Sequence, residues 1–234
     1  MRVLAIGAHP DDIDFTAGGT ISRLVAAGHG VSYCLVTNGQ AGGSEPGTSR
    51  LEQAKLRKDE QHRAAKVLGV SESFHLGLPD GAVTADLDLR RMLTKVIRTV
   101  RPELVVTPSP RYNLDNVHFL HPDHLATGSA SLAAVYPDSR NQFAFPELGL
   151  EPHQVSEVWL VEDPEPDYFV DISVNLDLKL EALAEHSSQF GTNADIAEEV
   201  YAHASKCAEL GGSIHLAAEA FKRITYTSLD QLEF

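Results

Sequence analysis

The sequence predicts a single α/β domain with a mainly parallel sheet and helices on both faces. Short apolar runs of strand length alternate with longer segments of helical periodicity along most of the 234 residues, a pattern typical of successive βαβ units. Polar clusters follow several of these runs, where the carboxyl ends of parallel strands form a binding crevice. No repeat or linker divides the chain, so we expect residues 1–234 to form one Rossmann-like domain.

Each expected strand is a short run of mostly apolar residues, far too brief to span a membrane and typical of a buried strand. The first run, Val3 to Ile6, leads directly into glycine, histidine and aspartate residues. Beyond residue 136 the alternation is less regular, but two further runs fit strands. The expected strands cover residues 3–6, 31–37, 73–76, 104–107, 155–161 and 168–172.

The expected helices are recognised by their ends. Gly69 lies in the C-terminal capping position of one helix, and Asp86 is placed to cap the start of the next, which Pro102 ends. Pro122 suits the first turn of a later helix, where its missing N–H does no harm. The expected helices cover residues 16–27, 51–68, 86–101, 122–135, 175–186 and 196–210.

Composition excludes some classes of function. The formal net charge is −14, so we expect no basic surface for nucleic acid and favour a neutral or cationic ligand. Cys34 and Cys207 are far apart and match no ligand spacing, and Cys34 is expected to be a buried thiol. We recognise no signal peptide and no membrane span, and expect a cytoplasmic protein.

A glycine-rich loop, residues 38–49, is longer than most connections between a strand and a helix. Long loops at strand ends are often functional lids, but a plain surface loop is an equally good interpretation. Its glycines do not match a phosphate-binding motif, because no lysine and no helix-opening glycine stand at the required places. The absence of G-x-G-x-x-G after the first strand likewise weakens a nucleotide-binding interpretation.

Two dense polar clusters stand at expected strand-to-helix junctions. They are H-P-D-D at residues 9–12 and H-P-D-H at residues 121–124. Two histidines and a carboxylate suit a zinc site that keeps one position open for water, and they also form the facial triad of non-haem iron. Either cluster alone is also compatible with a polar turn in which aspartate caps a helix. Together they predict a hydrolytic metal site with groups left over for acid–base chemistry.

The two clusters resemble those of the PIG-L/LmbE-like de-N-acetylases. Arg57 and Glu60 stand as in the R-x-x-E helix of that family, and Asp80 matches its carboxylate after the third strand. Residues 179–189, K-L-E-A-L-A-E-H-S-S-Q, are similar to its K-x-x-A-L-x-x-H-x-S-Q signature. The family includes deacetylases of N-acetylglucosaminyl phosphatidylinositol, of the sugar precursors of bacillithiol and mycothiol, and of chitobiose-type sugars.

The resemblance implies a metal centre at the first and second clusters. His9, Asp12 and His124 would bind Zn²⁺, with Fe²⁺ or another divalent ion as the alternative. The family usually has glutamate two residues after its second aspartate, whereas this chain has Asp14. That difference leaves the implied metal ligands in place.

The resemblance also implies the catalytic and substrate-binding groups. Asp11 would be the general base, and His121, with Asp123 beside it, would stabilise the oxyanion. Arg57 and Asp80 would hold sugar hydroxyls.

Two motif positions keep structural alternatives. Arg57 and Glu60 are three residues apart, so they also fit a helix ion pair worth about 0.3 kcal/mol. We favour a substrate role for Arg57 because its helix follows the glycine-rich loop. His186 fits a packing role at a helix end as well as a site role.

The protonation state of His121 is a separate expectation. A protonated ring would stabilise an oxyanion best, but a helix N-terminus and a nearby zinc ion both disfavour the imidazolium. We therefore expect a carboxylate, Asp123 or Asp115, to offset both effects.

These residues lead us to expect a zinc-dependent hydrolase that removes acetyl from an N-acetylated amino sugar, a GlcNAc-type small-molecule conjugate. The alternatives are an amidase for a sugar-linked conjugate or natural-product intermediate, and a metal-binding protein without catalysis. Intact Asp11 and His121 argue against the second alternative. The resemblance further implies a homo-oligomer, a trimer or hexamer.

Overall fold

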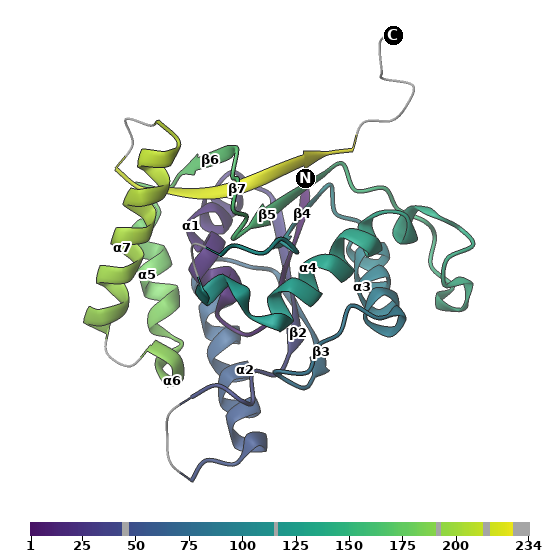
Figure 1. Ribbon diagram of the computed structural model, residues 1–234, viewed down its shortest axis with the longest axis horizontal. Helices are drawn as coiled ribbons and strands as arrows, with labels where there is room; N and C mark the ends of the chain where they lie inside the picture. Colours follow the sequence, from purple (N-terminus) through teal and green to yellow (C-terminus); the bar gives the residue numbers. More distant parts are fainter. Residues whose placement is uncertain (44–46, 115–116, 191–192, 213–215, 227–234) are drawn as a thin grey trace.

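Seven strands and the helices around them are seen in the computed structural model, which describes residues 1–43, 47–114, 117–190, 193–212 and 216–226 (Figure 1). The strands are β1 (Arg2–Gly7), β2 (Gly30–Thr37), β3 (Glu72–Leu78), β4 (Leu104–Pro108), β5 (Glu157–Val161), β6 (Tyr168–Asp171) and β7 (Ala218–Thr225). The α-helices are α1 (Asp12–Ala26), α2 (Arg50–Val67), α3 (Leu87–Val100), α4 (Pro122–Val135), α5 (Leu176–Ala184), α6 (Ser187–Phe190) and α7 (Asn193–Leu210). Short 3₁₀ helices are η1 (Val117–Leu120), η2 (Asp138–Arg140) and η3 (Pro146–Leu148).

The strands form one sheet in the order β3-β2-β1-β4-β5-β7-β6. Strands β1 to β5 pair in parallel, whereas β7 runs antiparallel to both β5 and β6. The chain first builds the sheet outward from β1 to β3 and then returns to place β4 on the other side of β1. The carboxyl ends of β1 and β4 therefore meet at the switch point, where ligands bind in such sheets.

Helices cover both faces of the sheet (Figure 1). Val3 and Ala5 of β1 pack in one core with residues of α1, α2 and α5. The alternating residues, Leu4 and Ile6, pack in a second core with residues of α3 and α4. The predicted α/β class, with a mainly parallel sheet between two helical layers, is confirmed.

Two features of the fold differ from the prediction. Helix α1 begins at Asp12 rather than at residue 16, because the chain reverses within the H-P-D-D cluster itself. Strand β7 was not predicted, since its sequence, A-E-A-F-K-R-I-T, carries charged residues and alanine where strands usually carry β-branched ones. It is nevertheless held between β5 and β6.

Helix α4 lies directly on the end of β4. A Cβ atom at Gly128 would stand 2.2 Å from the carbonyl oxygen of Pro108. Only glycine allows this approach of helix and strand, and the approach fixes where α4 starts.

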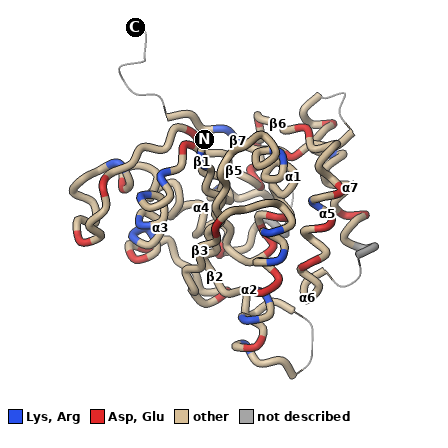
Figure 2. Tube along the Cα trace, turned by 180° about the vertical axis from the view of Figure 1, so that it is seen from behind, with Lys and Arg blue, Asp and Glu red and all other residues tan. Residues whose placement is uncertain are grey.

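Charges are distributed along the surface helices. Helix α2 carries both basic and acidic residues, whereas α3 is mainly basic after Asp88 (Figure 2). Arg91 pairs with Asp88 on α3 at 2.8 Å. Within the described ranges, no helix combines the length and the apolar character that crossing a membrane requires.

Candidate active site

The turn from β1 into α1 sends two neighbouring aspartates in different directions. Asp11 precedes α1 with a φ angle of 90°, a left-handed conformation that is rare and strained for residues other than glycine. Its side chain makes no capping hydrogen bond. Asp12 opens the helix, and its Oδ2 accepts a hydrogen bond from the backbone N–H of His9 at 2.7 Å. Asp11 therefore stands at the N-cap position without capping the helix through its side chain, and its carboxylate is available for other contacts.

The start of α4 brings the second cluster to the same place. Pro122 occupies the first turn as predicted, and His121 caps the helix by accepting the backbone N–H of Asp123 at Nδ1, 3.2 Å away. Asp123 and His124 follow in the first turn, both buried. The rings of His9 and His121 lie edge to face with centroids 4.7 Å apart. The structure thus brings the two predicted clusters together.

Three atoms of the predicted metal ligands form a small triangle. His9 Nδ1 lies 3.2 Å from His124 Nε2 and 3.4 Å from Asp12 Oδ2, and the edge from His124 to Asp12 is 3.3 Å. Ligand atoms about 2.0–2.1 Å from a tetrahedral zinc ion lie about 3.3–3.4 Å from one another. Two imidazole nitrogens and one carboxylate at these separations fit one face of such a site.

Carboxylates hold the other ring nitrogen of each histidine. Nε2 of His9 lies 3.2 Å from both Asp80 and Asp123, and Nδ1 of His124 lies 2.9 Å from Glu162. A histidine that binds metal through one nitrogen commonly donates its other N–H to a carboxylate, which fixes the ring. Asp80, Asp123 and Glu162 occupy that orienting position.

Glu162 was missed by the sequence analysis. It follows β5 directly, has a left-handed backbone with φ of 62°, and points its carboxylate at His124. The same strand-end argument that selected His9 applies to this position, because β5 lies next to β4 in the sheet. That argument, applied to V-E-D-P at residues 161–164, would have found it.

Asp123 is fully engaged by backbone groups as well as by His9. Its Oδ2 accepts the N–H of Gly81 at 2.7 Å, and its Oδ1 accepts the N–H of Val83 at 3.0 Å. The side chain therefore fastens the turn after β3 to the start of α4. Its position is that of an orienting group, while the catalytic role expected for Asp123 stays a prediction.

The buried acids give the site a strong preference for positive charge. Burial opposes charging of His9, but Asp12, Asp123 and Asp80 outweigh it and raise the pKa of His9 to about 12. Burial of His124 is likewise outweighed, by Asp12 and Glu162, and its pKa rises to about 11. Protons on these rings satisfy the same carboxylates that a divalent cation would satisfy.

Asp11 lies beside this triangle with its own set of partners. Its carboxylate accepts a hydrogen bond from Arg57 Nη2 at 3.0 Å, and its backbone N–H donates to Gln61 at 2.9 Å. Burial raises the pKa of Asp11 to about 6, against the lowering effect of Arg57. A carboxyl group tuned in this direction suits a general base that works near neutral pH.

The Arg57 side chain is enclosed by protein groups. The side chain is 4% exposed, and besides Asp11 it donates to the carbonyl oxygens of Pro10 at 2.6 Å and Gly39 at 3.1 Å. A Cβ atom at Gly39 would stand 2.6 Å from Nη1, so the loop backbone rests on the guanidinium. Asp80 Oδ2 accepts the N–H of Ala41 in the same loop at 3.1 Å. Contacts of Arg57 and Asp80 with sugar hydroxyls stay a prediction.

His121 is set up as a neutral hydrogen-bond donor. Because Nδ1 accepts the helix N–H of Asp123, the proton of the neutral ring belongs on Nε2. Burial and the neighbouring rings of His9 and His124 lower the pKa of His121, and the opposing effect of Asp123 is too small to reverse this. The expected protonated ring is therefore not supported. Asp115, the other expected partner, lies outside the described residues.

His186 and Asp14 form a buried pair beneath the site. His186 Nε2 lies 2.8 Å from Asp14, which also accepts hydrogen bonds from Tyr33 at 2.9 Å and Gln61 at 2.7 Å. His186 is fully buried, so it supports the network that reaches Asp11 through Gln61 and does not line the active site.

The expected alternative of an ion pair between Arg57 and Glu60 is not seen. The Glu60 carboxylate instead accepts the backbone N–H of Ser188 at 2.9 Å and its hydroxyl at 2.7 Å. The second half of the 179–189 motif is thereby fixed to α2.

A cavity of about 190 Å³ opens at these residues. It lies between the start of α1 and the helices α6 and α7. Its lining residues are Asp11, Asp12, Phe15, Thr16, His124, Glu162, Phe190 and Glu199. The cavity therefore gives a small acyl group access to Asp11 and to two residues of the triangle, Asp12 and His124.

Comparison with known proteins agrees with this geometry. The family described as GlcNAc-PI de-N-acetylase (PIG-L) matches residues 4–135. Diacetylchitobiose deacetylase of Thermococcus kodakarensis is 36% identical over 191 residues, which cover 81% of this chain and 70% of that protein. A 4-oxalmesaconate hydratase of Pseudomonas putida is 31% identical, over 77% of this chain and 70% of that protein.

The fold has a counterpart among solved structures. N,N'-diacetylchitobiose deacetylase from Pyrococcus horikoshii, in complex with its inhibitor MPG, superimposes with a TM-score of 0.88 and 30% identity. The match covers 96% of this chain and 84% of the other. The matched family region contains both histidine–aspartate clusters, and the protein belongs to the PIG-L family of GlcNAc-PI de-N-acetylases.

Proposed function

We propose that this protein is a zinc-dependent hydrolase that removes the acetyl group from an N-acetylated amino sugar, a GlcNAc-type unit within a larger conjugate. One observation carries the proposal: His9, Asp12 and His124 form a metal-ligand triangle, and Asp11 stands beside it in the same cavity, bound to Arg57. Hydrolysis of an amide needs a place to activate water and a group to move its proton, and these residues provide both.

His9, Asp12 and His124 would hold the metal ion. A bound Zn²⁺ ion would supply a water of lowered pKa and polarise the acetyl carbonyl. The mixed nitrogen and oxygen donors suit zinc, and Fe²⁺ is the alternative that the same donors accept. Asp123, Asp80 and Glu162 would keep the two rings in place.

Asp11 would take a proton from the attacking water as oxygen bonds to the acetyl carbon. The same carboxyl group would then return a proton to nitrogen as the C–N bond breaks, so that acetate and a neutral amine leave. The 3.0 Å hydrogen bond from Arg57 would favour the ionised form of Asp11 and hold its carboxylate in position. These roles require Asp11 to remain off the metal, as its separate partners allow.

His121 would donate its Nε2–H to the oxygen that gains negative charge. A ring nitrogen of His121 lies within 4.8 Å of ring nitrogens of both His9 and His124. A neutral donor in this position stabilises an oxyanion without adding a second positive charge next to the metal. The deacetylases among the relatives support the reaction as a whole.

A second candidate reaction is the addition of water to an unsaturated carboxylate. The relative named 4-oxalmesaconate hydratase favours it, and a metal site with an adjacent base can serve hydration as well as hydrolysis. We place it second, because the 36% identical relative and the structure with a TM-score of 0.88 are both deacetylases.

Acetate release separates the two reactions. Purified protein loaded with Zn²⁺ should release acetate and a primary amine from N,N'-diacetylchitobiose, and should leave the absorbance of 4-oxalmesaconate unchanged. Asp11→Asn should keep its metal and lose turnover by about 10²–10⁴-fold. Hydration of 4-oxalmesaconate without acetate release from any N-acetyl sugar would reject the deacetylase proposal.

Two further proposals rest on the family resemblance: an amino-sugar conjugate as substrate and an assembly of three or six copies. We also propose a cytoplasmic location, which rests on the sequence features given above. Light scattering after gel filtration measures the assembly directly.

A further inference from the structure

A second cavity, of about 270 Å³, lies beside the catalytic one. Thr16 and Glu162 line both cavities. Glu162 also contacts His124, one of the three proposed metal ligands, at 2.9 Å. The second cavity therefore begins one side chain away from the triangle of proposed metal ligands. A ligand with its acetamido group at the triangle can therefore extend into this space.

We infer that the second cavity binds the part of the substrate beyond the N-acetylated sugar, and that Lys206 recognises an anionic group there. The inference rests on the proposed function and adds the charge of the substrate to it. Lys206 lies on α7 and lines the cavity together with Asn113 from the loop after β4.

The cavity combines an apolar wall with one lysine, Lys206, and two carboxylates, Glu162 and Asp163. Val161, Pro164, Pro166 and Leu210 contribute apolar surface. In the part of the chain that the structure describes, the Lys206 ammonium makes no ion pair and no side-chain hydrogen bond. A ligand anion would give it a partner.

The acids near the cavity are already paired. Asp163 accepts hydrogen bonds from Ser109 at 2.7 Å and Arg111 at 3.1 Å, and Glu165 accepts one from Arg111 at 2.8 Å. Glu162 is held by His124. Each of these acids has a partner other than Lys206, and none of them is paired with the Lys206 ammonium.

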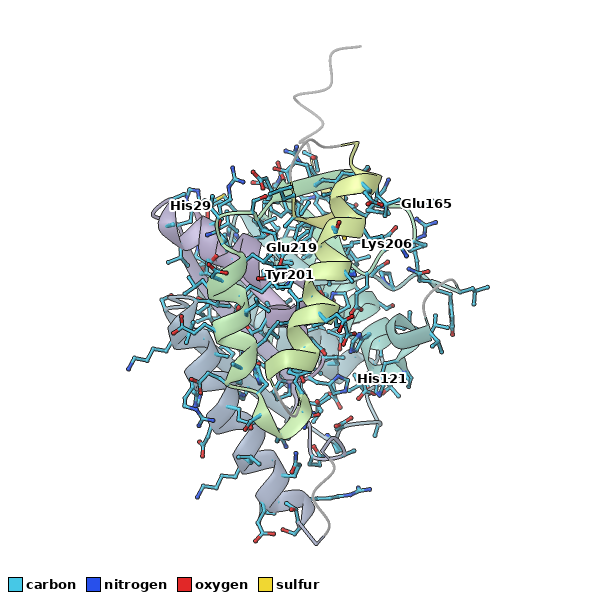
Figure 3. All side chains as sticks on the ribbon, turned by 90° about the vertical axis from the view of Figure 1, so that its left-hand side faces the viewer. His29, His121, Glu165, Tyr201, Lys206 and Glu219 are labelled. Atoms are coloured by element: carbon cyan, nitrogen blue, oxygen red, sulfur yellow. The ribbon has the colours of Figure 1, made fainter. Side chains whose placement is uncertain are left out.

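The two cavities differ in the charged groups that line them. The catalytic cavity is lined by Asp11, Asp12, Glu162 and Glu199, without a lysine or arginine, whereas the second cavity combines Lys206 with Glu162 and Asp163. Lys206 projects from α7 toward the side of the molecule where Glu165 and His121 also lie (Figure 3). A substrate that carries an anionic group away from its acetamido group can therefore pair that group with Lys206 while the acetamido group lies at the proposed metal ligands.

The test compares two disaccharides of nearly the same size. N,N'-diacetylchitobiose is neutral, and its aldonic acid, N,N'-diacetylchitobionate, carries one carboxylate at the end remote from the non-reducing acetamido group. With the wild-type protein, KM should be lower for the acid. In Lys206→Gln, KM for the acid should rise about fivefold, the factor expected for one partly exposed charge pair, with kcat unchanged. KM for the neutral disaccharide should not change.

Two controls sharpen the comparison. Lys66→Gln removes an exposed lysine from α2, away from both cavities, and should leave both KM values as in wild type. Lys206→Glu should reverse the preference and favour the neutral disaccharide. Equal KM changes for both substrates in Lys206→Gln, or none for either, would overturn the inference.

A binding measurement separates this inference from the proposed function. Calorimetry with Asp11→Asn gives the Kd of both disaccharides without turnover. Tighter binding of the acid to Asp11→Asn that is lost in the double variant Asp11→Asn, Lys206→Gln would support the cavity even if no acetate were released by the wild type. Acetate release by the wild type, together with equal Kd values for both disaccharides, would reject the cavity and keep the deacetylase.

Discussion

Glu162 holds His124 by its Nδ1 atom, at 2.9 Å, and so leaves Nε2 as the nitrogen that faces Asp12 and His9. The contact joins the end of β5 to the start of α4. Neither residue could orient the other if β5 did not follow β4 in the sheet. The strained backbone of Glu162, with φ of 62°, indicates that the position is constrained by this contact.

We expect Glu162→Gln to weaken metal binding by about 10–100-fold, the usual effect of removing a carboxylate behind a ligating histidine. Competition with a chromophoric chelator measures the affinity. Glu165→Gln is the matched control, because Glu165 pairs with Arg111 and not with His124. An unchanged affinity in Glu162→Gln would mean that His124 is oriented by other groups.

Metal analysis of purified protein should give close to one divalent ion per chain. His124→Ala should lose that ion and keep its circular dichroism spectrum, because the ring lies at the end of the sheet, outside the two main cores. His62 and His75 bring their Nε2 atoms within 3.2 Å on another part of the surface, so His75→Ala is needed as a control for stray metal. Full occupancy in His124→Ala but not in His75→Ala would remove His124 from the ligand set.

The pH dependence of kcat/KM should report Asp11. A general base acts when it is unprotonated, so activity should be present above the pKa of Asp11 and be lost as the pH falls through about 6, or lower once a bound cation favours the carboxylate. Arg57 lowers the pKa of Asp11, so Arg57→Gln should move this acidic limb to higher pH.

Arg57→Lys keeps the positive charge and serves as the control, with a smaller shift expected. Metal content must match the wild type in both variants. If the acidic limb stays in place in Arg57→Gln, the ionisation belongs to a group other than Asp11.

His121 should work without being protonated. We expect His121→Ala to keep its metal and to lose about 10²–10³-fold in kcat, as when one oxyanion donor is removed. The dependence of kcat/KM on pH above 7 should match the wild type, because a ring that is already neutral has no charge to lose there. Nitrogen-15 NMR of labelled histidine should show the His121 ring as the neutral Nε2–H tautomer at pH 7.5. A ring protonated on both nitrogens at that pH would restore the imidazolium interpretation.

Much of the site could be predicted because its residues are adjacent in sequence. H-P-D-D and H-P-D-H each place several polar groups at one strand-to-helix junction, and the strand-end rule brings both junctions to the same crevice. The short apolar runs also predicted strands β1 to β6 of a mainly parallel sheet, because its central strands β1, β2 and β4 are buried along nearly their whole length.

Contacts between distant segments could not be predicted. Glu162 becomes visible as a site residue only once β5 is known to lie beside β4. Arg57 and Glu60 are three residues apart and match a helix ion pair, but Asp11 and Ser188, from other parts of the chain, satisfy them instead. Strand β7 stayed hidden because Glu219 is buried in it, stabilised by Lys179 at 2.7 Å and by two N–H groups of α1.

The position of helix α7 bears on how the substrate range of related enzymes can change. The proposed metal ligands, Asp11 and His121 lie in the turn after β1 or at the starts of α1 and α4, within the family-matched residues 4–135. One wall of the second cavity, with Lys206 and Leu210, comes from α7, beyond that region. Substitutions at Lys206 and Leu210 can therefore change which conjugates are accepted without replacing a proposed metal ligand or Asp11. The separation is partial, because Glu199 of α7 also lines the catalytic cavity and Glu162, which contacts His124, lies beyond residue 135.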